Sequence, residues 1–183
     1  MDKEIRAYFA TIYSDSREHQ NAAFMALQEI TNEPVPWAYE IWDELLAALQ
    51  HPNNRVRAIA AQLLINLAKS DPQHRMQEDF PALFAVTRDG RFVTARHCLQ
   101  NIWKIGLVGK EQRNQVVTAL ETRYRECADE KNGTLIRYDV IQGLRKLYNT
   151  TGDEAIKGKA ADLIAIEPDL KYRQKYTTLW KGS

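Results

Sequence analysis

The sequence is poor in cysteine, lacks a long apolar run and carries almost no net charge. Its two cysteines, Cys98 and Cys127, fall in no CxxC or Cys/His spacing, which argues against a zinc site and a disulfide-stapled secreted fold. No segment approaches the roughly 18 apolar residues of a membrane span, and the opening MDKEIRAYFATIY lacks the apolar stretch of a signal peptide. Because 25 Lys and Arg stand against 24 Asp and Glu, no overall field attracts nucleic acid or an anionic membrane. We expect a cytoplasmic protein with no membrane partner, in which any charged binding site is local.

Local motifs of catalysis and metal binding are also missing. The segment from Gly106 to Glu111 places Glu where a phosphate-binding loop needs Ser or Thr, and neither GxGxxG nor HExxH occurs. His97 precedes Cys98 directly, but Cys98 falls on the apolar side of a helical pattern, so we interpret it as a core residue. We therefore expect no enzyme activity, no cofactor and no metal.

A repeat is present instead. Four segments carry apolar or small residues at i, i+4 and i+7, which is one face of a helix. They are Ala23, Leu27 and Ile30; Ala60, Leu64 and Leu67; Cys98, Ile102 and Ile105; and Val140, Leu144 and Leu147. The middle residues are 37, 38 and 42 positions apart, close to the repeat length of about 40 to 47 of HEAT and armadillo arrays.

Each of these helices follows another apolar helix, predicted over Lys3–Tyr13, Trp37–Gln50, Arg75–Arg88 and Lys110–Ala128. Short Asn, Asp, Gly and Pro turns separate them, so consecutive helices should run antiparallel. The prediction is a single all-α domain, residues 1–183, with hairpins at about 1–31, 36–69, 75–106 and 110–149. Residues 153–183 are expected to form a C-terminal cap that begins with a helix over Asp153–Ala165. Tyr172, Tyr176, Leu179 and Trp180 would then cover the last repeat.

The stretch LLAALQHPNNRVRAIAAQLLINLA resembles the HEAT repeat, with Val56 and Arg57 at the Val-Arg positions of that family. A second copy, FPALFAVTRDGRFVTARHCLQNIWKI, has the first-helix proline Pro81 and the turn aspartate Asp89, although its Arg96 is displaced by one position. Ile136-Arg137 restores the pair, and the resemblance covers roughly residues 1–150. It implies an armadillo-like α-α superhelix, a solenoid whose second helices line a concave surface where partners usually bind.

Projecting the repeat register onto the second helices predicts a polar strip with a basic bias along that surface. Its members are Gln62, Asn66, Arg96, Gln100, Trp103, Lys104, Tyr138, Gln142, Arg145 and Lys146. A purely solvated helix face is the alternative for this set. We interpret Arg57 and Arg137 as links between hairpins, and Trp37 and Trp42 as core. A pair between His97 and Asp139 is compatible with the register.

The strip predicts a non-catalytic protein-binding scaffold whose cations and amides hold an acidic protein segment. The alternative is a nucleic-acid-binding protein resembling the HEAT-like alkylpurine DNA glycosylases, with Asp139, Tyr138 and Trp103 meeting an extruded nucleotide; the near-zero net charge counts against it. HEAT-type tetrapyrrole lyases are a further class, but no residue marks a pigment pocket. The oligomeric state stays open, and an end face would suit a homodimer or a larger complex.

Overall fold

Five of the helices begin directly after a polar side chain that caps their first turn. Asp2, Ser16, Asn53, Asp153 and Asp169 each accept a hydrogen bond from a backbone N–H in the first turn of the helix that follows. Capping satisfies donors that have no partner inside the helix, which makes these positions natural helix starts.

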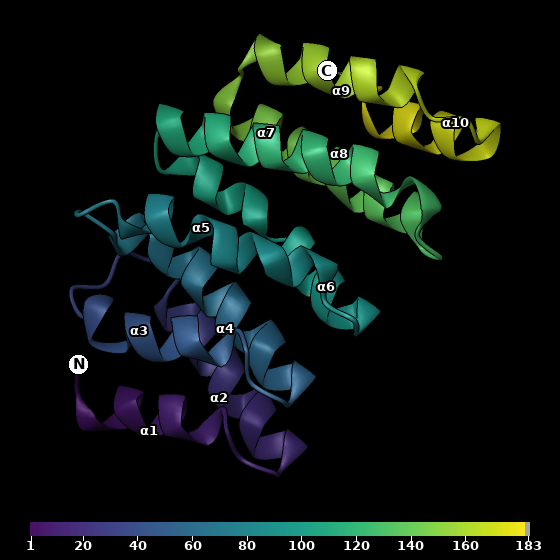
Figure 1. Cartoon of the computed structure of the whole chain (residues 1–183). Coiled ribbons are helices and arrows are strands. Elements are labelled where there is room, and N and C mark those ends of the chain that lie inside the picture. The colour runs from purple at the N-terminus through teal and green to yellow at the C-terminus, as the bar shows by residue number, and fades with distance from the viewer. Residues whose placement is uncertain (182–183) are drawn as a thin grey trace. The chain divides into compact units, whose positions relative to one another are not determined.

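The computed structural model describes residues 1–181, and all regular structure in that range is helical, with no strand (Figure 1). The α-helices are α1 Lys3–Thr11, α2 Arg17–Ile30, α3 Tyr39–Ala48, α4 Asn54–Leu67, α5 Arg75–Ala85, α6 Phe92–Leu99, α7 Lys110–Glu126, α8 Gly133–Thr151, α9 Glu154–Ala165 and α10 Leu170–Leu179. Four 3-10 helices join them: η1 Ala68–Ser70, η2 Val86–Arg88, η3 Ile102–Leu107 and η4 Cys127–Asp129. The predicted all-α class with repeat-like hairpins is confirmed. No described helix is both long and apolar enough to cross a bilayer.

One predicted helix is wrong. The second helix of the third hairpin was expected to run unbroken through Cys98, Ile102 and Ile105, but α6 ends at Leu99 and the chain resumes as η3. All three side chains are nevertheless buried. In a 3-10 helix residues i and i+3 lie one above the other, so Ile102 and Ile105 still share one face.

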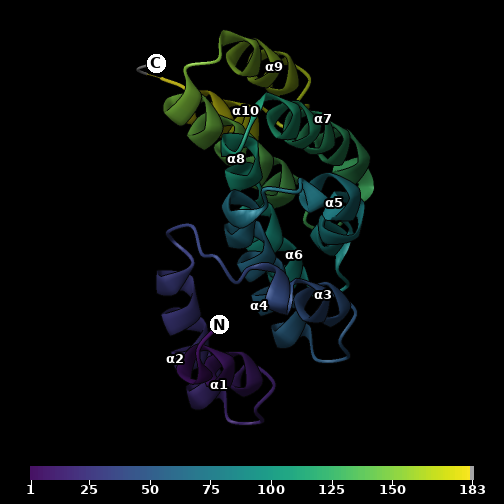
Figure 2. The same cartoon turned by 90° about the vertical axis from the view of Figure 1, so that its left-hand side faces the viewer.

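The chain divides into two compact units, Met1–Cys98 and Leu99–Ser183, which we call the N-terminal and C-terminal units. In the N-terminal unit α1, α3 and α5 form one layer, and α2, α4 and α6 form the other (Figures 1 and 2). Leu27 and Leu64, the middle residues of two repeat triplets, are buried between them. Trp37 and Trp42 are buried as predicted, and Trp42 Nε1 donates to Asp79 of α5 at 2.8 Å.

In the C-terminal unit α8 contacts every other helix, with α7 and α9 in one layer and α8 and α10 in the other (Figure 2). Leu144 and Leu147 are fully buried in this unit. The predicted cap proves to be a pair of helices, since α10 follows α9. Tyr176 of α10 is buried and donates to the backbone oxygen of Thr134 at 2.6 Å, which confirms its packing role. Gly182 and Ser183 lie outside the described residues.

The two signature arginines link neighbouring hairpins, as predicted. Arg57 donates to both carboxylate oxygens of Asp89, at 2.6 and 2.9 Å, and to the backbone oxygens of His51 and Pro52. Arg137 donates to Glu167 at 3.0 Å and to the backbone oxygen of Tyr124. Each arginine therefore joins the turn or helix end before it to an acid in the turn of the next hairpin.

Candidate binding sites

The ten residues of the predicted strip are divided between the two units. Gln62, Asn66 and Arg96 belong to the N-terminal unit, and the other seven belong to the C-terminal unit. A continuous strip across both units therefore stays a prediction.

In the N-terminal unit the two amide residues are buried rather than exposed. Gln62 is 8% exposed and donates to the backbone oxygen of Ala58, while Asn66 is 2% exposed and donates to Oγ1 of Thr31, the residue directly after α2. The register places both on the outer face of α4, but α2 packs against this helix and covers that face. Arg96 is half-buried, with its guanidinium 5.7 Å from the ring centre of Phe92.

In the C-terminal unit the predicted residues gather around α8. Tyr138, Gln142, Arg145 and Lys146 recur at helical spacing and are all half-buried. Trp103 is half-buried, and Lys146 Nζ lies 5.8 Å from its ring centre. We call the set Trp103, Lys104, Tyr138, Gln142, Arg145, Lys146 and Lys175 the α8 surface.

Two further contacts of the α8 surface come from the C-terminal helix. Lys175 of α10 lies 4.6 Å from the ring centre of Tyr138, and Arg145 lies 5.2 Å from that of Trp180. Arg145 Nη1 is buried and has no hydrogen-bond partner. Lys175 could not be predicted from the sequence, because α10 lies outside the repeat register and no spacing connects this residue to α8.

Gln100 is hydrogen-bonded to a buried residue of α8. Its amide nitrogen donates to Asp139 Oδ1 at 3.1 Å, and Asp139 is only 1% exposed. The carboxylate of Asp139 is therefore held inside the C-terminal unit. The suggested partner of Asp139, His97, belongs to the other unit, so a pair between them stays a hypothesis.

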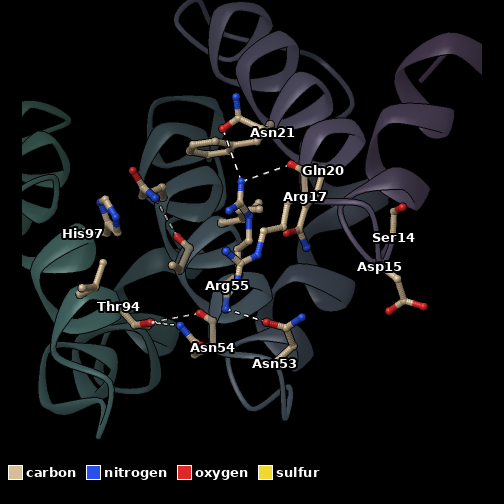
Figure 3. A pocket seen from close by; sticks show the side chains of 15 residues that line it. Ser14, Asp15, Arg17, Gln20, Asn21, Asn53, Asn54, Arg55, Thr94 and His97 are labelled. Carbon is tan, nitrogen blue, oxygen red and sulfur yellow. Dashed lines mark hydrogen bonds between the residues drawn. The ribbon is translucent and has the colours of Figure 1, made fainter.

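The N-terminal unit contains a pocket of about 680 Å³ where α2, α4 and α6 begin. Figure 3 shows Arg55 of α4 reaching toward Asn21 of α2, while Asn54 faces Thr94 of α6. Arg17 and His97 also line the pocket. Among the strip residues only Gln62 touches it, because the strip follows the middles of the second helices and the pocket lies at their starts.

Arg55 is weakly held in this pocket. Its Nη2 donates to the backbone oxygen of Arg17 and to Asn21 Oδ1, both at 3.5 Å, which is long for a hydrogen bond. Its Nε is buried without a hydrogen-bond partner. Within residues 1–181 neither Arg17 nor Arg55 forms an ion pair, and the one acid in the lining is Asp15.

Both cysteines are buried core residues. Cys98 is fully buried and contacts the backbone oxygen of Leu83, and burial raises the pKa of its thiol to about 12. Burial also raises the pKa of the Cys127 thiol. A thiolate is the reactive form of cysteine, so neither side chain is poised as a nucleophile. The described residues contain no cluster of three or more His, Cys, Asp or Glu side chains arranged to hold a metal ion.

Comparison of the chain with known protein families finds no match, and a search of curated proteins finds none either.

Proposed function

We propose that this chain is a HEAT-like scaffold protein that binds an acidic segment of a partner protein on the α8 surface. The proposal rests on one observation above all. Arg145, Lys146 and Lys175 lie beside aromatic rings, and none of them forms an ion pair with a described residue. Carboxylates of a partner would supply the missing counter-charges through charge-assisted hydrogen bonds.

The charge of the C-terminal unit supports the proposal. Residues 99–183 carry 15 Lys and Arg against 11 Asp and Glu, a net charge of +4. Such a local excess attracts an acidic segment, and the attraction weakens with salt. The HEAT assignment is supported by the links of Arg57 and Arg137, which occupy the same position in two repeats and join hairpins in the same way.

A protein ligand fits the aromatic side chains better than a single-stranded nucleic acid does. Bases bind by stacking on the faces of aromatic rings. Here Lys146, Arg145 and Lys175 each lie over a ring, on Trp103, Trp180 and Tyr138 respectively. Each cation thus occupies one face that a base would need, while its charge remains able to meet a carboxylate.

The glycosylase alternative finds less support. It requires an acidic residue that reaches an extruded nucleotide, and the candidate Asp139 is buried and hydrogen-bonded to Gln100. We propose the cytoplasm as the place of action, because two free, buried cysteines suit a reducing compartment.

The proposal is tested with a fluorescent glutamate-rich peptide, titrated against wild type and the double variant Lys146→Glu, Lys175→Glu. We expect the variant to bind at least about tenfold more weakly, since each reversal turns an attraction into a repulsion. The matched control is Lys110→Glu, Lys131→Glu, which makes the same change in net charge at two exposed sites of the C-terminal unit outside the α8 surface.

Equal weakening in both double variants would show that only net charge matters and would contradict a site on the α8 surface. A single-stranded oligothymidine, measured at the same salt concentration, provides the second comparison. If it binds more tightly than the peptide, the acidic-segment proposal is wrong and nucleic acid becomes the better ligand.

A further inference from the structure

The pocket of the N-terminal unit is cationic in a part of the chain that is otherwise acidic. Residues 1–98 contain ten Lys and Arg against thirteen Asp and Glu, a net charge of −3. The pocket nevertheless presents Arg17 and Arg55 against the single acid Asp15. This local reversal of charge distinguishes the pocket from its surroundings and points to an anionic ligand.

Arg55 is the strongest indication. Buried N–H groups in proteins nearly always have an acceptor, yet Arg55 Nε has none and its other contacts are long. An oxyanion placed between α2 and α4 would supply acceptors to both arginines. Arginine is well suited to this because its planar guanidinium offers several donors to a phosphate or carboxylate group.

The N-terminal ends of three helices add to the positive charge of the pocket. Arg17 is the first residue of α2, Asn54 is the first residue of α4, and Val93 and Thr94 lie in the first turn of α6, and all four line the pocket. Helix N-termini carry a partial positive charge and favour anions. Two arginines without ion pairs and three helix starts together suit a group with about two negative charges, as a phosphate monoester has near neutral pH.

The rest of the lining indicates the kind of molecule that carries the phosphate. A volume of about 680 Å³ is within the range of small-molecule sites. The side chains of Asn21, Asn53 and Asn54 provide amides for hydroxyl groups, while Phe24 and Ile59 provide apolar contact. We propose that this pocket binds a small phosphorylated molecule with a polar body, such as a sugar phosphate, with Arg17 and Arg55 holding the phosphate group.

His97 reports on the charge of the pocket. Burial lowers the pKa of its imidazole, and the positive charges of Arg96 and Arg55 lower it further. The charge of Arg55 therefore acts on His97 inside the N-terminal unit. A bound phosphate would offset that charge, so the pKa of His97 should rise when the pocket is filled.

The experiment is an NMR titration of the full-length chain with ribose 5-phosphate, inorganic phosphate and ribose. We expect saturable shifts at Asn21, Arg55, Thr94 and His97 with ribose 5-phosphate, weaker binding of inorganic phosphate and none of ribose. In the variant Arg17→Gln, Arg55→Gln the affinity should fall about tenfold to a hundredfold, as expected when a charged hydrogen-bond donor is removed. The matched control Lys3→Gln, Arg88→Gln removes the same charge from the same unit at exposed residues outside the pocket lining.

Shifts in wild type at other residues, equal binding of ribose, or unchanged affinity in the double variant would each overturn the proposal. If the double variant does not fold, Arg55→Lys replaces it, because this variant keeps the charge and loses the planar fork; undiminished affinity would then contradict the role of Arg55. A phosphoserine peptide that binds more tightly than ribose 5-phosphate would show that the ligand is a modified protein and not a small molecule.

Discussion

The two units share a way of joining hairpins but differ in charge. In the N-terminal unit Arg57 bonds Asp89, which also accepts the backbone N–H of Arg91 two residues further on. In the C-terminal unit Arg137 bonds Glu167, which likewise accepts the backbone N–H of Asp169 two residues further on. The net charges, by contrast, are −3 and +4. The arginine–acid links that join the hairpins are thus shared by the two units, whereas the net charge around each candidate binding site is not.

The environments of the two arginine links are not the same. The side chain of Glu167 is 1% exposed, and the hydroxyl group of Tyr124 donates to it at 3.4 Å. The side chain of Asp89 is 7% exposed, and the positive charge of Arg91 acts on it in addition to that of Arg57. Loss of the arginine should therefore be harder to tolerate in the C-terminal unit.

The largest expected effect comes from removing these arginines. Arg137→Met leaves the Glu167 carboxylate buried without its cation and should lower the free energy of unfolding by about 3 to 5 kcal/mol. Arg57→Met should cost about 1 to 3 kcal/mol, because Arg91 still stabilises Asp89. Urea denaturation of both variants measures the difference. Equal losses would show that the two links are energetically equivalent in spite of their different burial.

The apolar repeat core should respond in the same way in the two units. Leu64 and Leu144 occupy the same repeat position and are both fully buried. Replacing either with Ala should lower the free energy of unfolding by about 2 to 5 kcal/mol through loss of burial and creation of a cavity. Similar losses in the two units would support equivalent packing of the repeats. Unchanged thermal unfolding of either variant would mean that the repeat register is wrong.

Lowering the pH should have a smaller effect on stability, through the carboxylate of Asp89. Although burial acts to raise the pKa of Asp89, hydrogen bonds from Arg57 and the Arg91 N–H and their positive charges hold it below its ordinary value. A depressed pKa adds stability that is present above the unfolded value of about 3.9 and is lost as the pH falls through the folded value. The stability difference between wild type and Asp89→Asn should thus be constant near neutral pH and shrink below about pH 4.

Asp162→Asn in the C-terminal unit is the control for the acid titration, because Asp162 is exposed and forms no hydrogen bond or ion pair with a described residue. The free energy of unfolding of Asp162→Asn should stay close to that of wild type over the whole pH range. A stability difference for Asp89→Asn that persists unchanged to strongly acidic pH would show that the bond to Arg57 does not depend on the charge of Asp89.

The smallest effect on stability belongs to the α8 surface. Lys146→Glu with Lys175→Glu should change the free energy of unfolding by no more than about 0.5 kcal/mol per site, because neither lysine is part of an ion pair or of the core. Thermal unfolding of the double variant checks this. A large loss would mean that these lysines hold α8 and α10 together, and that the α8 surface is a structural contact.

Much of the fold could be predicted from local sequence. The positions Ala60, Leu64 and Leu67 recur at helical spacing, and burial of such a stripe is what drives helices to pack. The roles of Arg57 and Arg137 also followed from the repeat, since the same position meets the same neighbours in each copy. The break after Leu99 could not be predicted, because the apolar spacing of Cys98, Ile102 and Ile105 is the same for both backbone paths.

The candidate sites, like the fold, were predictable from the sequence only in part. The sequence by itself determined the helices, the hairpins and the stripe of Tyr138, Arg145 and Lys146 on α8, because these depend on spacing within one segment. Tertiary structure alone brought Lys175 to Tyr138 and placed Arg17 beside Arg55, since these residues come from different helices. It also buried Asn66, which the helical register left on an open face. The physical reason is that periodicity reports which side of a helix a residue occupies, whereas exposure and pairing depend on what packs against that side.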